Sequence, residues 1–297
     1  MANLTALLVA RAKADPDAWA DGNKPGLCVL APAVSHYCIS RSASIMGMGS
    51  RSIREVPVTD LEIMTAESLR ATHRQAVEEG QQIMAVVANA CATATGLYDP
   101  LDEIGQYCNE QGLWFHVDGA HGASALLSEA HSDKMKGIHR ADSMIWDAHK
   151  MLRTSALCAA VLVKDYKNLH ATFRQKGSYL FFDKEQKGFD LLNHTIECTK
   201  AALGTKLYLV LAAEGEQAIG DYVDYTYDLT AAFYKLIQSR NHFESNYHPE
   251  SNILCFRYTK GNSDALQLSI RDKLTQYGDY YITTCLLYTS PSPRDRG

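Results

Sequence analysis

The feature that most constrains this chain is an alternation between residues 26 and 163, where short apolar runs are separated by longer amphipathic stretches. Apolar runs of about four to eight residues are typical of strands in a parallel sheet that is buried between helices. The runs that we predict as strands are residues 27–31, 53–58, 84–88, 113–117, 143–146 and 157–163. The chain is therefore expected to be an α/β protein whose mixed, mostly parallel sheet is flanked by helices.

The stretches between these runs carry apolar residues at helical spacing, which predicts helices at residues 39–46, 66–79, 101–111 and 124–136. Thr65 is suited to cap the helix at 66–79, because a threonine side chain can accept from the free backbone N–H groups of a first turn. Gly80, Gly112 and Gly137 are expected at helix ends, where glycine adopts the left-handed conformation without strain.

The pattern changes beyond Asn193, where long helical periodicity at residues 195–213 and 217–239 is followed by a strand-like run at 252–258. We predict a large domain over residues 1–215 and a partial, smaller α+β domain over residues 216–284. Residues 285–297 break all periodicity, and their segment CLLYTSPSPRD resembles a translated sequencing adapter. We therefore expect a non-native tail there.

Charge and hydropathy exclude several classes of partner. The formal net charge is −5, which does not favour binding to nucleic acid. The apolar run at residues 156–163 is far shorter than the roughly 20 residues that span a bilayer, and no export signal precedes it, so no membrane association is expected. The eight cysteines form no CxxC pair, which indicates reduced thiols and a cytoplasmic protein.

Polar side chains follow three neighbouring predicted strands, at the edge of an α/β sheet where ligands bind. Asn89 and Thr93 follow the run at 84–88, Asp118 follows the run at 113–117, and Lys150 follows the run at 143–146. An amine beside a carboxylate suits pyridoxal phosphate, because the lysine forms a Schiff base and the carboxylate keeps the ring nitrogen protonated. This pattern is the first indication of that cofactor.

Two ordered motifs resemble a known family. His116-Val117-Asp118-Gly119-Ala120 and the segment from Ala141 to Lys150 are similar to the HVDAA and ADSxxWxxHK blocks of group II pyridoxal-phosphate-dependent amino-acid decarboxylases. This family contains glutamate, cysteine-sulfinate, diaminobutyrate and aromatic amino-acid decarboxylases. The resemblance extends from residues 2–11 through residues 35–36 and 92–100 to residues 178–181, and so covers roughly the first 215 residues. It implies fold type I, the fold of pyridoxal-phosphate-dependent transferases.

The resemblance also implies roles for single residues. Lys150 would carry the cofactor, Asp118 would pair with its ring nitrogen, and His36 would stack on the ring near the substrate carboxylate. Tyr179, in the segment Ser178-Tyr179-Leu180-Phe181, matches the tyrosine of a mobile loop that returns a proton to the α-carbon. These residues are the predicted centre of the reaction.

Four further residues are expected to hold the cofactor. Thr93 would hydrogen-bond near the ring and Ala120 would pack on its other face, while Asp147 and His149 would help to hold the phosphate. The family's glycine- and serine-rich phosphate turn would precede Met1, so the resemblance implies a chain that is cut at both ends. Without that turn, the chain is expected to hold the cofactor poorly and to be inactive.

The family pattern implies decarboxylation of an L-amino acid by a homodimer whose subunits share their active sites. Residues 178–181 look closest to the glutamate decarboxylase version of the loop, which favours an acidic amino acid such as glutamate or aspartate. The chain departs from the pattern at Gly119, at His121 and at residues 197–200, where ECTK replaces the commoner CGR. These departures leave the substrate undetermined at this stage.

Two alternatives stay open. Another enzyme of fold type I, an aminotransferase or a desulfurase, would use the same lysine and aspartate. His116, Asp118 and His121 could instead form the metal site of a hydrolase, since His116 and Asp118 share one face of an extended strand. We assign no metal, because a metal site would leave Lys150, Thr93 and Tyr179 without a function.

Overall fold

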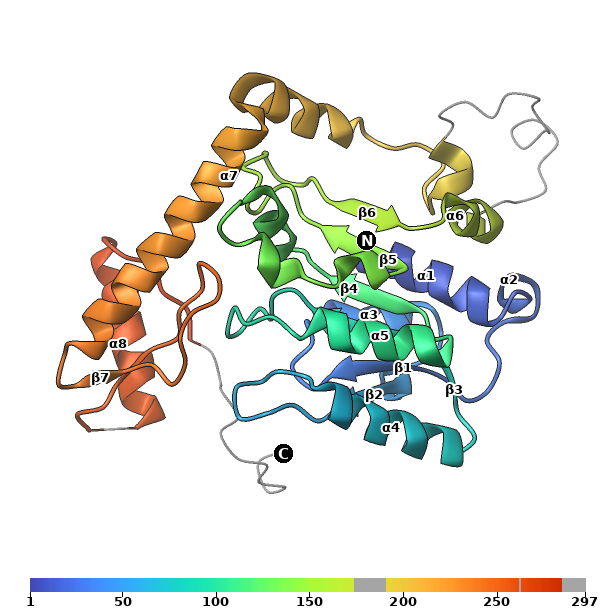
Figure 1. The fold of residues 1–297 in the computed structure, drawn as a ribbon, viewed down its shortest axis with the longest axis horizontal. Helices are drawn as coiled ribbons and strands as arrows, with labels where there is room; N and C mark the ends of the chain where they lie inside the picture. Colours follow the sequence, from blue (N-terminus) through green and yellow to red (C-terminus); the bar gives the residue numbers. More distant parts are fainter. Residues whose placement is uncertain (174–190, 262, 285–297) are drawn as a thin grey trace.

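The computed structural model describes residues 1–173, 191–261 and 263–284 (Figure 1). Its main sheet has six strands in the order β2-β1-β3-β4-β5-β6. The first five strands of this order run parallel and β6 is antiparallel to β5, so the prediction of a mixed, mostly parallel sheet is confirmed. The strands are β1 (Leu27–Pro32), β2 (Ile53–Val56), β3 (Gln82–Asn89), β4 (Phe115–Asp118), β5 (Ser143–Trp146) and β6 (Ala160–Val163).

Helices cover both faces of this sheet, and each face has its own apolar core (Figure 1). The core on one face joins the sheet to α4 (Ala66–Glu78) and α5 (Leu101–Gln111). The core on the other face joins it to α1 (Ala2–Ala14), α3 (Cys38–Ile45) and α6 (Tyr166–Phe173). A short helix, α2 (Ala18–Asp21), follows α1.

Local sequence accounts for the ends of two helices. Thr65 caps α4 as predicted, because its side chain accepts from the backbone N–H of Ser68 while the Ser68 hydroxyl accepts from the N–H of Thr65. Gly112 ends α5 in the left-handed conformation, with φ of 63°.

The helix predicted at residues 124–136 is wrong. The segment forms short 3₁₀ turns instead, over Gly122–Leu127 and Ser132–Met135, followed by another at Ile138–Arg140. The Ser128 hydroxyl lies between them, where it donates to Asp224 and accepts from the backbone N–H of His131. The His131 N–H thus bonds to a side chain and not to the carbonyl of Leu127, as a continuous helix would require.

Helix α1 has no counterpart among the predicted elements. Its residues from Asn3 to Arg11 are all buried, so the helix lacks the exposed polar face that produces a recognisable apolar stripe. Periodicity alone could not reveal it.

The chain beyond residue 190 is dominated by α7 (Leu203–Gln238), which runs from the main sheet to the C-terminal segments (Figure 1). The helix begins at Leu203, eight residues after the predicted start at residue 195. Gly215 interrupts it with φ of 82° and ψ of 163°, a conformation that glycine adopts readily. The domain boundary near this position stays a prediction.

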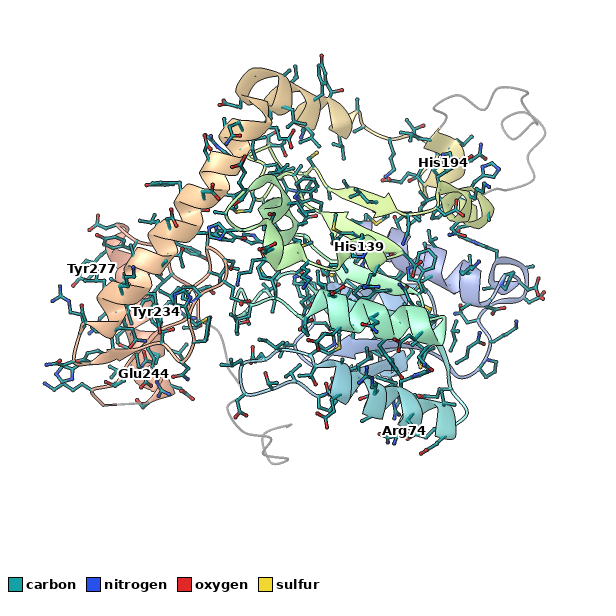
Figure 2. The ribbon with its side chains drawn as sticks, viewed as in Figure 1. Arg74, His139, His194, Tyr234, Glu244 and Tyr277 are labelled. Carbon is teal, nitrogen blue, oxygen red and sulfur yellow. The ribbon has the colours of Figure 1, made fainter. Side chains whose placement is uncertain are left out.

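A 3₁₀ turn at Leu191–His194 precedes α7. The elements that follow α7 lie at its far end and are β7 (Phe243–Glu244), β8 (Arg257–Tyr258) and α8 (Asp264–Tyr277). The strand predicted at 252–258 is reduced to β8, which pairs with β7. Figure 2 shows Tyr234 of α7 and Glu244 of β7 at this end, with Arg74 of α4 on the opposite side. No helix among the described residues is long and apolar enough to cross a membrane.

Candidate active site

The candidate site lies where β3, β4 and β5 end. Asn89, the last residue of β3, is paired in register with Asp118, the last residue of β4, and Asp118 is paired with Ile145 of β5. The turn that carries Lys150 begins directly after β5. The parallel sheet therefore brings the predicted carboxylate and the predicted amine to one edge, as expected for an α/β binding site.

Lys150 is held in a turn that is anchored from both sides. The Asp147 N–H donates to the carbonyl of Ala120, and the Lys150 N–H donates to the carbonyl of Asp147. Ala148 and Leu152 are buried against Ile219 of α7. The Lys150 side chain is 39% exposed, and its Nζ lies 3.1 Å from Asp147 Oδ2. The amine is thus placed by a fixed turn but stays accessible.

Asp118 is almost completely buried, and both of its carboxylate oxygens have a donor. Oδ1 accepts from the backbone N–H of Ala120 at 3.2 Å, and Oδ2 accepts from Asn3 Nδ2 at 3.0 Å. Sequence reasoning missed Asn3, which lies on the unpredicted helix α1. The available signal was a polar residue that opens an apolar stretch, Asn3-Leu4-Thr5-Ala6-Leu7.

His36 lies in the segment between β1 and α3, within electrostatic reach of the lysine and of both acids. Burial lowers the pKa of His36, the negative charges of Asp118 and Asp147 oppose this effect, and the positive charge of Lys150 adds to it. The ring accepts at Nδ1 from the backbone N–H of Cys38 at 3.3 Å. The structure therefore gathers His36, Asp118, Asp147 and Lys150 in one site.

His121, whose role the sequence did not indicate, joins the C-terminal part of the chain to this site. Its Nε2 lies 2.6 Å from Asn252 Oδ1, and Asn252 Nδ2 donates to the sulfur of Met151 at 3.4 Å. Burial lowers the pKa of His121, and the neighbouring charge of Lys150 lowers it further. The contact spans 131 residues, so no local pattern could have indicated it.

The other predicted residues differ in their contacts. The backbone of Ala120 contacts both Asp118 and Asp147, as described above. His149 is engaged by the backbone of Cys158, whose carbonyl lies 2.7 Å from His149 Nδ1. Thr93 is exposed in the loop between β3 and α5, and its hydroxyl makes no hydrogen bond within the described residues. Tyr179 lies outside them.

The donor set fits pyridoxal phosphate. It combines an accessible primary amine, a buried carboxylate and an imidazole, which are the groups that hold the aldehyde carbon and the ring of this cofactor. Asn89, the strand neighbour of Asp118, has a buried side-chain nitrogen without a hydrogen-bond partner in the described part of the chain. One polar group beside the carboxylate is therefore still unsatisfied.

The alternative metal site is not supported by the geometry. His116 is fully buried, and its two ring nitrogens lie 2.8 Å from Ser143 Oγ and 2.8 Å from Asn3 Oδ1. Neither nitrogen is free to bind a metal ion. Within residues 1–173, 191–261 and 263–284, no group of three or more His, Cys, Asp and Glu side chains is arranged to hold a metal.

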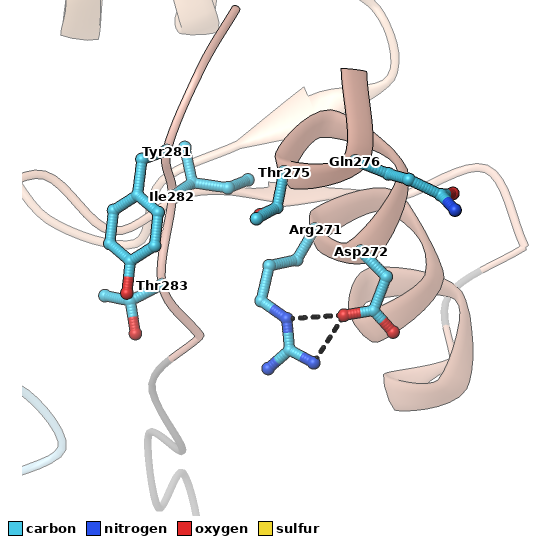
Figure 3. Close-up of a pocket in the computed structure, with 7 residues that line it drawn as sticks. All are labelled: Arg271, Asp272, Thr275, Gln276, Tyr281, Ile282 and Thr283. Atoms are coloured by element: carbon cyan, nitrogen blue, oxygen red, sulfur yellow. Dashed lines mark hydrogen bonds and ion pairs between the residues drawn. The ribbon is translucent and has the colours of Figure 1, made fainter. Parts of the chain in front are cut away.

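Two surface hollows lie away from these residues. A hollow of about 570 Å³ lies between α8 and the segment at 281–283, and the Arg271 guanidinium is paired there with Asp272 at 2.6 Å (Figure 3). A second, of about 370 Å³, lies between α4 and α5. Neither contains a residue of the predicted site.

Comparisons with known proteins place the chain in one family. The family model described as "Pyridoxal-dependent decarboxylase conserved domain" matches residues 1–259. Cysteine sulfinic acid decarboxylase of Mus musculus is 34% identical over 263 residues, which cover 86% of this chain and 53% of that protein. L-aspartate decarboxylase dtxS4 of Metarhizium robertsii is 32% identical over 267 residues, which cover 89% of this chain and 53% of that protein.

Solved structures of the same kind are also similar. The crystal structure of mouse CSAD superposes with a TM-score of 0.89 at 28% identity, covering 96% of this chain and 63% of that one. The glutamate decarboxylase domain of a Vibrio parahaemolyticus protein superposes with a TM-score of 0.83 at 25% identity, covering 97% of this chain and 59% of that one. The chain spans about half the length of the curated relatives it matches.

Proposed function

Because the chain belongs to the pyridoxal-dependent decarboxylase family, we propose that it serves the decarboxylation of an L-amino acid to an amine and carbon dioxide, with pyridoxal phosphate as cofactor. The observation that carries this proposal is the convergence of Lys150 and Asp118 at the carboxyl ends of adjacent parallel strands.

The chemistry that pyridoxal phosphate supplies when bound is an electron sink for the bond pair that is left when carbon dioxide departs. Lys150 would hold the cofactor through its amine, and its accessible position would leave that attachment open to a substrate amine. Asp118 provides a fixed negative charge that holds a proton on the ring nitrogen. The two residues thus anchor opposite ends of one ring.

The remaining site residues orient groups around this pair. We assign His36 to the substrate carboxylate and one ring face, and Ala120 to the other face. We assign Asp147 and His149 to the phosphate and Thr93 to a hydrogen bond near the ring. Tyr179 is proposed as the donor of a proton to the substrate α-carbon.

We propose an acidic amino acid as the substrate. The support comes from the names of relatives: cysteine sulfinic acid decarboxylase, acidic amino acid decarboxylase and L-aspartate decarboxylase. Carbon dioxide release should be measured with cysteine sulfinate, aspartate, glutamate, 2,4-diaminobutyrate and an aromatic amino acid. Faster turnover of either of the last two than of any acidic substrate would contradict the assignment.

A homodimer with shared active sites is proposed as the functional assembly. The support is a set of large apolar side chains that are exposed on α7: Tyr208, Leu209, Tyr225, Leu229, Phe233 and Leu236. Exposed apolar surface of this extent is typical of an interface. Light scattering on the purified protein should give twice the chain mass, and a monomer at micromolar concentration would exclude the dimer.

The cofactor assignment is tested by chemical trapping. The protein should be incubated with pyridoxal phosphate, reduced with borohydride and digested, and the labelled peptide should be identified by mass spectrometry. We expect the label on Lys150 and its loss in Lys150→Ala. Lys164→Ala is the matched control, since that lysine follows β6 and its Nζ donates to the backbone carbonyl of His139. A label on another lysine, or none, would refute the proposal.

A further inference from the structure

Five polar side chains are linked by hydrogen bonds behind the candidate site. Trp114 Nε1 donates to Ser143 Oγ at 2.9 Å, and Ser143 Oγ lies 2.8 Å from His116 Nδ1. His116 Nε2 lies 2.8 Å from Asn3 Oδ1, and Asn3 Nδ2 lies 3.0 Å from Asp118 Oδ2. The chain of contacts connects α1, β4 and β5, and it ends on the carboxylate that faces the cofactor site.

The chemistry of its two ends sets the direction of each bond. A carboxylate can only accept, so Asn3 must turn its NH₂ group toward Asp118 and its carbonyl oxygen toward His116. That oxygen also can only accept, so the proton of His116 lies on Nε2. Every step from the carboxylate to the histidine is therefore determined by the step before it.

The positions of the hydrogens between Trp114, Ser143 and His116 can be assigned in the same way. Burial lowers the pKa of His116 to about 4, so the ring is neutral and its Nδ1 is an acceptor. An indole N–H can only donate, so Ser143 Oγ accepts from Trp114 and gives its own hydrogen to His116 Nδ1. No polar atom of these three side chains is left without a partner.

Asn3 is the element of the network that has no alternative orientation. Its second N–H donates to the sulfur of Cys38 at 2.9 Å, so both N–H groups and the oxygen are occupied. Rotating the amide by half a turn would place its oxygen against the Asp118 carboxylate and its NH₂ group against the Nε2–H of His116. Both contacts are repulsive, and the site is buried, so water cannot relieve them.

We propose that Asn3 is a positioning residue that fixes the Asp118 carboxylate for the cofactor before the cofactor binds. Asn3 holds Oδ2 while the Ala120 N–H holds Oδ1, so the carboxylate plane cannot rotate. The ring nitrogen of pyridoxal phosphate then meets an acid whose orientation is already set, and binding does not have to order it. This inference rests on the proposed function, because it assigns Asp118 to that nitrogen.

A double-mutant cycle on cofactor affinity tests whether Asn3 acts through Asp118. The dissociation constant of pyridoxal phosphate should rise about 10-fold or more in Asn3→Ala, on the scale of one lost hydrogen bond to a charged group. In the Asp118→Ala background, the same change at Asn3 should have less than about 2-fold effect, because the partner is absent. Equal effects in both backgrounds would overturn the proposal.

The control is Thr5→Val on the same helix. The buried Thr5 side chain donates to the carbonyl of Met1, away from Asp118, so this variant should leave the affinity unchanged. If Asn3→Ala does not fold, Asn3→Leu replaces it, because leucine fills a similar volume and cannot donate to Asp118. Equal affinity losses in Thr5→Val and in the Asn3 variant would also overturn the proposal.

Nitrogen-15 NMR of His116 in the protein without cofactor tests the network independently of any binding. We expect the proton on Nε2 in the wild type and a doubly protonated ring in Asn3→Asp, where a carboxylate replaces the amide beside it. A proton on Nδ1 in the wild type would refute the network. Failure of the wild type to bind pyridoxal phosphate would instead refute the proposed function, while this measurement would still decide the contacts of Asn3.

Discussion

The two ends of the candidate site differ in how tightly they are held. At the acid end, Asp118 is almost completely buried and each carboxylate oxygen has a hydrogen-bond donor. At the amine end, Lys150 is 39% exposed and its Nζ is paired only with Asp147 among the described residues. The acid end is buried and held on both oxygens, whereas the amine end is accessible and held by one ion pair.

This difference fits the roles proposed for the two ends. A residue that holds a charge beside a ring nitrogen works best when its orientation is set in advance, which requires burial and several hydrogen bonds. A lysine that gives up its bond to a substrate amine needs access and freedom to move.

The largest effect is expected at the open end. Lys150→Ala should lower decarboxylase activity by about 10³-fold or more, on the scale of losing a covalent catalyst. The midpoint of thermal unfolding should stay close to that of the wild type, since the side chain is exposed. Carbon dioxide release measures the activity and calorimetry measures the midpoint. A large drop in the midpoint would show that Lys150 also holds the fold together.

Asp118→Asn is expected to follow, with a loss of about 10²–10³-fold in kcat, as for removal of one fixed electrostatic contact in an active site. Asparagine keeps the size of the side chain but removes the negative charge. The variant should still become labelled on Lys150 after borohydride reduction, because the amine end is intact. Wild-type kcat in this variant would show that the buried carboxylate does not act on the cofactor.

His116, which is buried behind Asp118, should make the free energy of unfolding depend on pH. The pKa of His116 is lowered by burial from its ordinary 6.5 to about 4. Between these values the unfolded chain binds more protons, so stability should fall as the pH drops from 6.5 to 4, by roughly 1 kcal/mol per pH unit. Above pH 6.5 this histidine should contribute no pH dependence.

Urea unfolding of the wild type and of His116→Gln across this range isolates the effect. In the variant, the free energy of unfolding should depend less steeply on pH between 4 and 6.5, because glutamine does not titrate. Asp99, whose pKa burial raises to about 7, contributes with the opposite sign but is present in both proteins, so it cancels in the difference. Identical slopes would mean that His116 is not buried in its neutral form.

Ser143→Ala should lower the free energy of unfolding by about 1–3 kcal/mol at pH 7, because Trp114 Nε1 and His116 Nδ1 both lose their buried partner. Urea denaturation measures this directly. Ser40→Ala serves as the control, since that hydroxyl is bonded to the carbonyl of Tyr37 in an exposed position. A change as small as that of the control would show that the network adds nothing to stability.

The smallest change in stability is expected for Asp147→Asn at the open end. The ion pair between Asp147 and Lys150 is partly exposed, so its loss should cost less than about 1 kcal/mol of unfolding free energy. The same denaturation experiment provides the value. A loss larger than that of Ser143→Ala would reverse the comparison between the two ends.

Prediction from sequence succeeded where a local pattern of residues is enough to fix the structure. Six apolar runs became the six strands of the main sheet, and the residues that follow β4 and β5 lie at one edge because parallel neighbours end together. This is why Asp118 and Lys150 could be named in advance. Thr65 could be named as a cap for the same reason, since its partner Ser68 is three residues away.

The prediction failed where side chains distant in sequence decide the local structure. The segment at 124–136 has helical periodicity, but the His131 N–H donates to the hydroxyl of Ser128, which is itself bonded to Asp224 of α7. The run at 252–258 resembles a strand, yet Asn252 is bonded to His121 instead of to a neighbouring strand. Such contacts do not appear in any local pattern.

The sequence by itself therefore determined the parallel sheet, the order of its strands along the chain and the two residues that meet at its edge. Only the tertiary structure decided which groups orient them, because Asn3 and Asp118 are 115 residues apart and their contact depends on how α1 packs on the sheet. Periodicity reports which side of an element is buried, whereas a directed hydrogen bond depends on the position of both partners in space.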